Sequence, residues 1–272
     1  MSHHPSLAGR VILITGASRG LGREMVYALA EAGAKLALMG AKQSDALTTL
    51  GVEIPQSITL TADVGRPEQT AAAVAEAEAR FGRIDVLVNN AGLGMRRVSE
   101  TFNTTPTKFW ETSTDAWSDI IDANVNGPFN MARAAVPGMV KRGFGKVINV
   151  STSAQTMVRR GYAPYGPSKA ALEAYSRVWA QDLEGTGVDV NVYLPGGAAD
   201  TDLLPDSANK KGADGNLLPA SIMRRGIGWL CSDASNGVTG ARFIARLWDE
   251  ALPQEEAARA ARDDSGEMPK IL

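Results

Sequence analysis

The sequence has few of the residues that many enzymes use for catalysis or metal binding. Its 272 residues include two histidines, His3 and His4, which both lie in the leading segment. The single cysteine, Cys231, excludes an internal disulfide and a cysteine metal cluster, and an unpaired cysteine is most often a buried, inert side chain. We therefore expect neither histidine-based catalysis nor a bound metal.

Long apolar runs and a strong excess of one charge are missing as well. No apolar run approaches the roughly 18 residues that a membrane helix needs, and residues 1–5 lack the basic and apolar regions of a signal peptide. The formal charge of −2 gives no sign of a basic surface for nucleic acid. These absences predict a cytoplasmic protein that binds neither membranes nor nucleic acid.

Short apolar segments alternate with helical patterns along the chain, and 44% hydrophobic residues can supply a large core. This alternation predicts one α/β domain over residues 8–250, a doubly wound parallel sheet with helices on both faces. Residues 1–7 are expected to form a flexible tail and residues 251–272 a peripheral one. The segments expected to be strands are residues 10–14, 35–39, 57–61, 84–88, 146–150, 188–194 and 242–245. The expected helices are residues 25–32, 67–81, 114–141, the segment that begins at Tyr165, and a segment from about residue 218 to Cys231.

A glycine-rich turn joins the first expected strand to the first expected helix. Gly16, Gly20 and Gly22 let the backbone approach a pyrophosphate, and the helix start presents free N–H groups to it. The stretch from Gly16 to Gly20 also fits G-x-S-x-G, the nucleophile elbow of hydrolases, with Ser18 as the nucleophile. That chemistry needs a histidine later in the chain, and none follows. A dinucleotide phosphate site is therefore the better interpretation.

The residues after the second expected strand bear on the choice of cofactor. Dinucleotide folds usually place a carboxylate here for the ribose of NAD, whereas a basic residue suits the 2′-phosphate of NADP. No carboxylate occurs before Asp45, and Arg19 and Lys42 can both reach such a phosphate. This pattern favours NADP(H). An ordinary surface lysine explains Lys42 equally well, so NAD(H) stays open.

Tyr165 and Lys169 are four residues apart and would be neighbours on one face of a helix. A free tyrosine has a pKa of about 10, and a nearby ammonium lowers that pKa, which would make the phenol a usable general acid/base. Pro167 is compatible with a first helical turn, whose N–H groups have no helical partner. The pair alone is a weak signal, because coincidence can produce it.

Several motifs in register resemble the short-chain dehydrogenase/reductase family over about residues 8–247. They are Thr15 with Gly16, Gly20 and Gly22; Asp63-Val64; Asn89-Asn90-Ala91-Gly92; Asn124; Tyr165 with Lys169; and Pro195-Gly196. The resemblance implies a Rossmann fold with seven parallel strands in the order 3-2-1-4-5-6-7, and a homodimer or homotetramer.

The resemblance also implies an NAD(P)-dependent oxidoreductase that acts on a small carbonyl or alcohol substrate. The cofactor would contact Tyr165, Lys169 and the residues Thr15, Gly16, Ser18, Arg19, Gly20, Leu21, Gly22, Lys42, Asp63, Val64, Asn90, Ala91, Gly92, Pro195, Gly196 and Thr201. A cofactor-binding regulator without chemistry is the alternative from another functional class.

The same resemblance assigns the catalytic roles. Tyr165 would exchange the proton, Lys169 would bind the nicotinamide ribose and lower the pKa of Tyr165, and Asn124 would hold a water that relays protons. A hydroxyl before the tyrosine would hold the substrate oxygen. The family spacing favours Thr152, and Ser153 is one residue later.

The substrate side is less distinctive. Arg96, Arg97, Arg159 and Arg160 lie in two loops expected near the pocket and can select an acidic or acyl-thioester substrate, although solvated loop charge is the preferred interpretation. An apolar lining by Phe109, Trp110, Met157 and Val158 is the alternative. The family often ends its last strand with Asp-Gly-Gly, whereas this chain has Arg-Leu-Trp-Asp at residues 246–249. The resemblance therefore does not predict which residues form the floor of the pocket.

Overall fold

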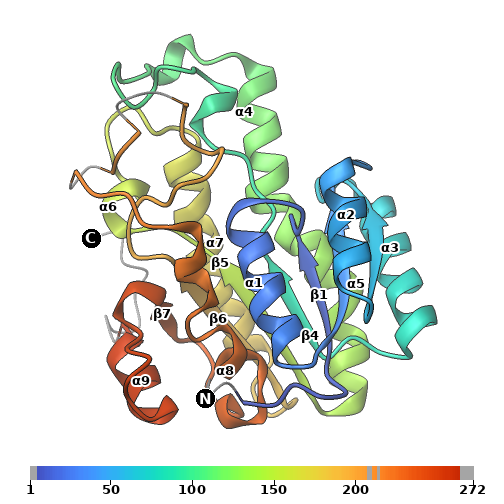
Figure 1. The fold of residues 1–272 in the computed structure, drawn as a ribbon. Helices are drawn as coiled ribbons and strands as arrows, with labels where there is room; N and C mark the ends of the chain where they lie inside the picture. The colour runs from blue at the N-terminus through green and yellow to red at the C-terminus, as the bar shows by residue number, and fades with distance from the viewer. Residues whose placement is uncertain (1–4, 207–209, 213–214, 264–272) are drawn as a thin grey trace.

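A seven-stranded parallel sheet forms the centre of the protein (Figure 1). The computed structural model describes residues 5–206, 210–212 and 215–263. The strand order is β3-β2-β1-β4-β5-β6-β7, as predicted, and every neighbouring pair is parallel. The strands are β1 (Val11–Thr15), β2 (Lys35–Gly40), β3 (Ser57–Thr61), β4 (Val86–Asn89), β5 (Gly145–Val150), β6 (Val188–Leu194) and β7 (Arg242–Ile244).

Helices cover both faces of this sheet, which separates the core into two clusters. Successive residues of a strand point to opposite faces, so Ile12 and Ile14 pack on one side and Leu13 on the other. The first cluster includes side chains of α1 (Gly20–Glu31), α2 (Asp45–Glu53), α8 (Ile227–Cys231) and α9 (Gln254–Ala261), and the second those of α3 (Pro67–Phe81), α5 (Gly127–Arg142) and α7 (Tyr165–Asp182). Both faces of the central strands are therefore buried.

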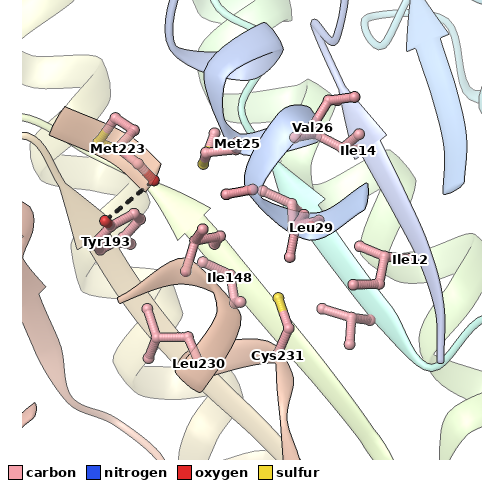
Figure 2. Packing of buried hydrophobic residues seen from close by; sticks show 14 of the residues in the cluster. Ile12, Ile14, Met25, Val26, Leu29, Ile148, Tyr193, Met223, Leu230 and Cys231 are labelled. Carbon is pink, nitrogen blue, oxygen red and sulfur yellow. Dashed lines mark hydrogen bonds between the residues drawn. The ribbon is translucent and has the colours of Figure 1, made fainter. Parts of the chain in front are cut away.

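Figure 2 shows the first cluster at close range, where α1 and α8 meet over the sheet. Met25 and Leu29 of α1 and Leu230 of α8 are fully or almost fully buried here. Cys231 is buried with them, and burial raises the pKa of its thiol to about 12. This cysteine is an unreactive part of the core, in the sense that its thiolate is strongly disfavoured at neutral pH.

Local sequence signals explain several of the helix ends. Helix α3 has Pro67 in its first turn and ends at Gly82, whose left-handed φ of 82° suits a glycine. Helix α2 was not expected from the sequence. It is short and buries Leu47 and Leu50, and its clearest signal is Ser44, whose side chain accepts a hydrogen bond from the N–H of Leu47.

Two of the expected helices are interrupted. The segment 114–141 consists of α4 (Thr114–Ile121), a π-helical turn at Asp122–Asn126, and α5. The pattern that ends at Cys231 is split into a 3-10 helix at Ala220–Arg224 and α8. Gly226 separates the two with a φ of 72°, and a Cβ atom on it would lie 2.5 Å from the Trp248 ring.

The expectations for the chain ends are wrong for several residues. Leu7, placed in a flexible tail, is buried, and its N–H donates to the carbonyl of Ala32. The segment beyond Pro253, expected to be peripheral, forms α9, which packs Ala257, Ala258 and Ala261 into the core. Small alanines allow this close approach. The rest of these two expectations, for residues 1–4 and 264–272, lies outside the described residues. No helix in the described part of the chain is both long and apolar enough to cross a membrane.

We expect Ala257→Glu to lower the melting temperature by at least about 5 °C, because an unpaired buried charge costs several kcal/mol. The matched control is Ala260→Glu, on the exposed side of the same helix, which should change it by less than about 2 °C. Thermal unfolding followed by circular dichroism measures both. Equal small shifts would show that α9 is not part of the core.

Candidate active site

A cavity of about 510 Å³ lies where β5 and β6 end. Ligands bind outside the carboxyl ends of the strands in open α/β sheets. Thr152, Tyr165, Gly196 and Thr201 all line this cavity. The structure thus brings together the hydroxyls that were predicted to be catalytic and the loop after β6 that was predicted to bind the cofactor.

The glycine-rich turn after β1 is bonded to the loop after β4. Thr15 Oγ1 accepts hydrogen bonds from the N–H groups of Asn90 and Ala91, each at 3.0 Å. The Asn90 Nδ2 donates to the carbonyls of Thr15 at 2.9 Å and Gly16 at 3.1 Å. A Cβ atom on Gly22 would lie 2.1 Å from the Gly16 carbonyl oxygen. The turn is therefore packed backbone against backbone, without room for a side chain.

The beginning of α1 fits an anionic group such as a diphosphate. Its N-cap residue, Arg19, makes no capping hydrogen bond with its side chain, and no acidic residue occupies the first turn. Gly16 and Gly20 have left-handed φ values of 64° and 52°. The chain can therefore turn sharply between β1 and the start of α1. Free N–H groups and the positive end of the helix dipole favour a negative ligand at this place.

The other residues expected around the cofactor differ in their exposure and in their contacts. Thr201 lies against the glycine turn, since a Cβ atom on Gly20 would be 3.2 Å from its Cγ2. Arg19 pairs with Asp202 at 3.2 Å, and both side chains are exposed. Lys42 is exposed after the end of β2. The carboxylate of Asp63, also exposed, accepts from the N–H of Gly65, while Val64 is buried.

Tyr165 begins α7, so that Pro167 falls in the first turn as expected. The hydroxyl of Thr152 is hydrogen-bonded to the Tyr165 phenol, which lowers the pKa of Tyr165, but burial has the larger effect and raises that pKa above its usual value. Ser153 is engaged elsewhere: its Oγ accepts from the N–H of Thr156 as the N-cap of α6 (Ala154–Met157). Thr152 rather than Ser153 faces the phenol.

Lys169 lies one turn further along α7 and is buried. Its Nζ donates to the carbonyl oxygen of Val150 at 2.9 Å. Burial lowers the pKa of Lys169 to about 8, and the carboxylate of Glu173 opposes this shift. The expectation of a lowered pKa for Tyr165 is thus wrong for this structure, because the ammonium is directed at a backbone carbonyl and burial dominates at the phenol.

Asn124 lies in the π-helical turn and is fully buried. Its Oδ1 accepts from the N–H of Leu93 at 2.8 Å, and its Nδ2 donates to the Leu93 carbonyl at 2.9 Å. The same Nδ2 lies 3.0 Å from the hydroxyl of Ser168 on α7. The side chain therefore joins the loop after β4 to the helix that carries Tyr165 and Lys169.

The loop arginines divide into two groups. Arg159 lines the cavity and lies over the ring of Tyr162 at 4.9 Å. Arg96 pairs with Glu100 and Arg97 with Asp119, and neither lines the cavity, as solvated loop charge predicts. Arg160 is exposed and is not part of the lining either.

The apolar part of the lining differs from the alternative drawn from the sequence. Phe109, Trp110 and Val158 are exposed and do not line the cavity, and the buried Met157 does not line it either. Met95, Phe102, Leu203 and Leu204 do so instead. Sequence reasoning missed them because their loops have no periodic pattern.

Several polar residues of the lining were not among the predicted site residues, and Ser151, Arg242 and Asp263 are examples. Ser151 is buried, and its Oγ has no hydrogen-bond partner. Arg242 and Asp263 line the cavity from the other end of the chain. The only sequence signal for Ser151 was its place beside Thr152, and for the other two there was none.

The chain belongs to the short-chain dehydrogenase family, whose family model, described as short chain dehydrogenase, matches residues 10–212. A short-chain type dehydrogenase/reductase of Picea abies is 37% identical over 208 residues, 73% of each chain. The 3-oxoacyl-(acyl-carrier-protein) reductase of Salmonella typhi is 28% identical over 242 residues, 86% of this chain and 95% of the relative. The protein is therefore an NAD(P)-dependent oxidoreductase of this family.

Two solved structures have the same fold. The 3-ketoacyl-(acyl-carrier-protein) reductase of Brucella melitensis, complexed with NADH, superimposes with a TM-score of 0.77 at 28% identity, covering 87% of this chain and 96% of that one. A gluconate 5-dehydrogenase of Burkholderia cenocepacia, in complex with NADP and tartrate, gives 0.76 at 30% identity, covering 88% and 94%. A nicotinamide cofactor thus occurs with both phosphorylated and unphosphorylated adenosine ribose in this fold.

We expect Gly22→Ala to weaken NADPH binding at least about tenfold, because the added methyl group forces the turn away from its bonded position. The matched control is Gly138→Ala in α5, where the added Cβ meets only the flexible ends of Glu78 and Arg142. Titration of nicotinamide fluorescence measures both dissociation constants. Unchanged binding in Gly22→Ala would place the cofactor elsewhere.

Proposed function

We propose that the protein transfers a hydride between NADP(H) and a small carbonyl or alcohol substrate. The observation that carries this proposal is the hydrogen bond between the Thr152 hydroxyl and the Tyr165 phenol at the wall of the cavity. A general acid and a hydrogen-bond donor side by side suit an oxygen that changes between carbonyl and alcohol.

Each residue of the group has a separate role in this mechanism. Tyr165 gives a proton to the substrate oxygen during reduction and removes it during oxidation, and Thr152 holds that oxygen by donating from its hydroxyl. The buried ammonium of Lys169 stabilises the phenolate that forms on Tyr165. Asn124 keeps α7 and the loop after β4 in register, and a water near it relays the proton. Bound at the glycine turn, a nicotinamide supplies the hydride chemistry.

The cofactor preference rests on charge around the expected ribose. Arg19 and Lys42 are both exposed, and the turn that follows β2 has no carboxylate before Asp45. A 2′-phosphate gains two cations there, whereas the ribose hydroxyls of NAD gain no acceptor. The backbone of residues 16–22, with Asp63, Val64, residues 90–92, Pro195, Gly196 and Thr201, would hold the rest of the molecule.

Two other functions compete with this one. An NAD-dependent alcohol dehydrogenase would use the same residues in the oxidation direction. A regulator that binds the cofactor without turnover is favoured by one observation, the raised pKa of Tyr165, which disfavours the phenolate. A panel of ketones and alcohols assayed with NADP(H) and with NAD(H) separates these functions. The initial rates with the two cofactors distinguish the two dehydrogenases, and a regulator binds the cofactor but never turns over.

The assembly and location that we propose follow from the family and the surface. Phe129 of α5 and Val178 of α7 are about half exposed, at 50% and 52%, and large apolar side chains on long helices suit contact with a second copy. We therefore favour a homodimer or homotetramer through these helices, and a cytoplasmic location.

Tyr165→Phe should lower kcat at least about 100-fold, because general acid/base catalysis contributes that much or more. Binding of NADPH should stay within about threefold, since the ring is kept. Tyr162→Phe removes a phenol from the same cavity and should keep most of the turnover. Initial rates at saturating cofactor decide the matter, and full activity in Tyr165→Phe would rule out this assignment.

The double variant Arg19→Ala with Lys42→Ala should raise KM for NADPH about tenfold or more and leave KM for NADH nearly unchanged, because a phosphate loses two cations. Lys35→Ala is the control, an exposed lysine at the opposite end of β2. If the wild-type protein prefers NADH, or the double variant affects both cofactors equally, the preference for NADP is wrong.

A further inference from the structure

Three charged side chains from distant parts of the sequence meet behind the loop that carries Thr152. Arg242 Nε lies 3.1 Å from both carboxylate oxygens of Glu173 on α7. Its Nη1 lies 2.7 Å from Asp263 Oδ2, and its Nη2 donates to the carbonyl oxygen of Thr152 at 2.9 Å. All three nitrogens of the guanidinium therefore have a partner.

The side chains of Arg242 and Glu173 are almost completely buried, with 6% and 4% exposed. A buried ion pair often adds little net stability, because the cost of removing its charges from water offsets their attraction. A planar guanidinium, on the other hand, fixes the direction of several acceptors at once. The main effect of such a guanidinium is therefore to fix the positions of the residues that it binds.

Arg242 is connected to both halves of the catalytic group. On one side it holds the backbone carbonyl of Thr152, whose hydroxyl is bonded to Tyr165. On the other side it holds Glu173, which lies one helical turn beyond Lys169 on α7. A shift of the guanidinium would move the loop after β5 relative to this helix.

Asp263 brings the end of the described chain into the same contact. Its N–H donates to the Arg242 carbonyl at 2.7 Å, and Arg262 forms an antiparallel bridge with Phe243. Helix α9, just before it, is anchored in the core by its buried alanines. The segment after α9 is thus fixed beside β7, with the Asp263 side chain at the cavity wall.

We propose that Arg242 is a positioning residue for the reaction, with Glu173 and Asp263 as its two anchors: it fixes the Thr152 backbone against α7 so that the hydroxyls of Thr152 and Tyr165 stay in place. This inference rests on the proposed function for its kinetic consequence. Its structural consequence, the fixed loop at residues 151–153, is independent of turnover.

The test compares Arg242→Gln and Arg242→Lys with Lys146→Gln in the full chain. Lys146 forms another buried ion pair, with Asp189, and joins β5 to β6 in the same sheet. Lys146 does not line the cavity. Lys146→Gln therefore removes a buried charge, as Arg242→Gln does, but does not affect the loop that carries Thr152.

For the substrate that is turned over fastest in the panel, Arg242→Gln should lower kcat by about 10- to 100-fold, the loss that a misplaced catalytic group causes. The dissociation constant for NADPH should stay within about threefold, and Arg242→Lys should recover part of kcat. Lys146→Gln should lower the melting temperature to a similar extent but keep kcat within about threefold. Full kcat in Arg242→Gln, or losses in both variants that follow stability alone, would overturn the proposal.

Hydrogen exchange gives a second readout that needs no turnover. Amides of residues 151–154 should exchange faster in Arg242→Gln than in the wild-type protein, and at the wild-type rate in Lys146→Gln. If Arg242→Gln does not fold, Asp263→Asn, which removes the negative charge of one anchor and keeps its shape, answers the same question. A wild-type protein without turnover would refute the proposed function alone, whereas unchanged exchange at these residues would refute the positioning role.

Discussion

The hydrogen bonds of Thr15 with the backbone of Asn90 and Ala91 are the constraint on which the rest of the site depends. They join the end of β1 to the end of β4, which are neighbouring strands in the middle of the sheet. The glycine turn is held against Asn90 as well, because the Asn90 side chain donates to the carbonyls of Thr15 and Gly16. The proposed cofactor site and the proposed catalytic group therefore share this edge of the sheet.

A second set of bonds holds the catalytic side in place relative to the first. Asn124 joins Leu93, in the loop after β4, to Ser168 on α7. Thr152 reaches the same helix through Tyr165, and Arg242 reaches it through Glu173. Three separate strands are thus connected to one helix. A rigid support of this kind keeps reacting groups in place without a rearrangement at each turnover.

Much of this arrangement could be predicted from the sequence, because the signals are local. Buried parallel strands appear as apolar runs, Pro67 and Gly82 mark a helix, and Thr152 was favoured over Ser153 by spacing alone; in the structure Thr152 is bonded to the phenol. The rest depends on contacts between distant residues. The packing of α9, the pairing of Arg242 with Glu173 and Asp263, and the direction of the Lys169 ammonium involve partners that no short pattern links. The pKa of Tyr165 depends on burial, which the four-residue spacing to Lys169 cannot indicate.

The π-helical turn at Asp122–Asn126 also limits how the chain can change in length. Such a turn holds one residue more than a regular helical turn, so removing a single residue would restore an ordinary α-helix through this region. Because the widened turn absorbs the additional residue, the helical segments on either side of it would keep their direction, and the apolar face of α5 would stay on the sheet. The loss would fall on the turn itself, which places the Asn124 side chain against Leu93. The widened turn therefore sets the position of one amide side chain without disturbing the packing of the helices around it.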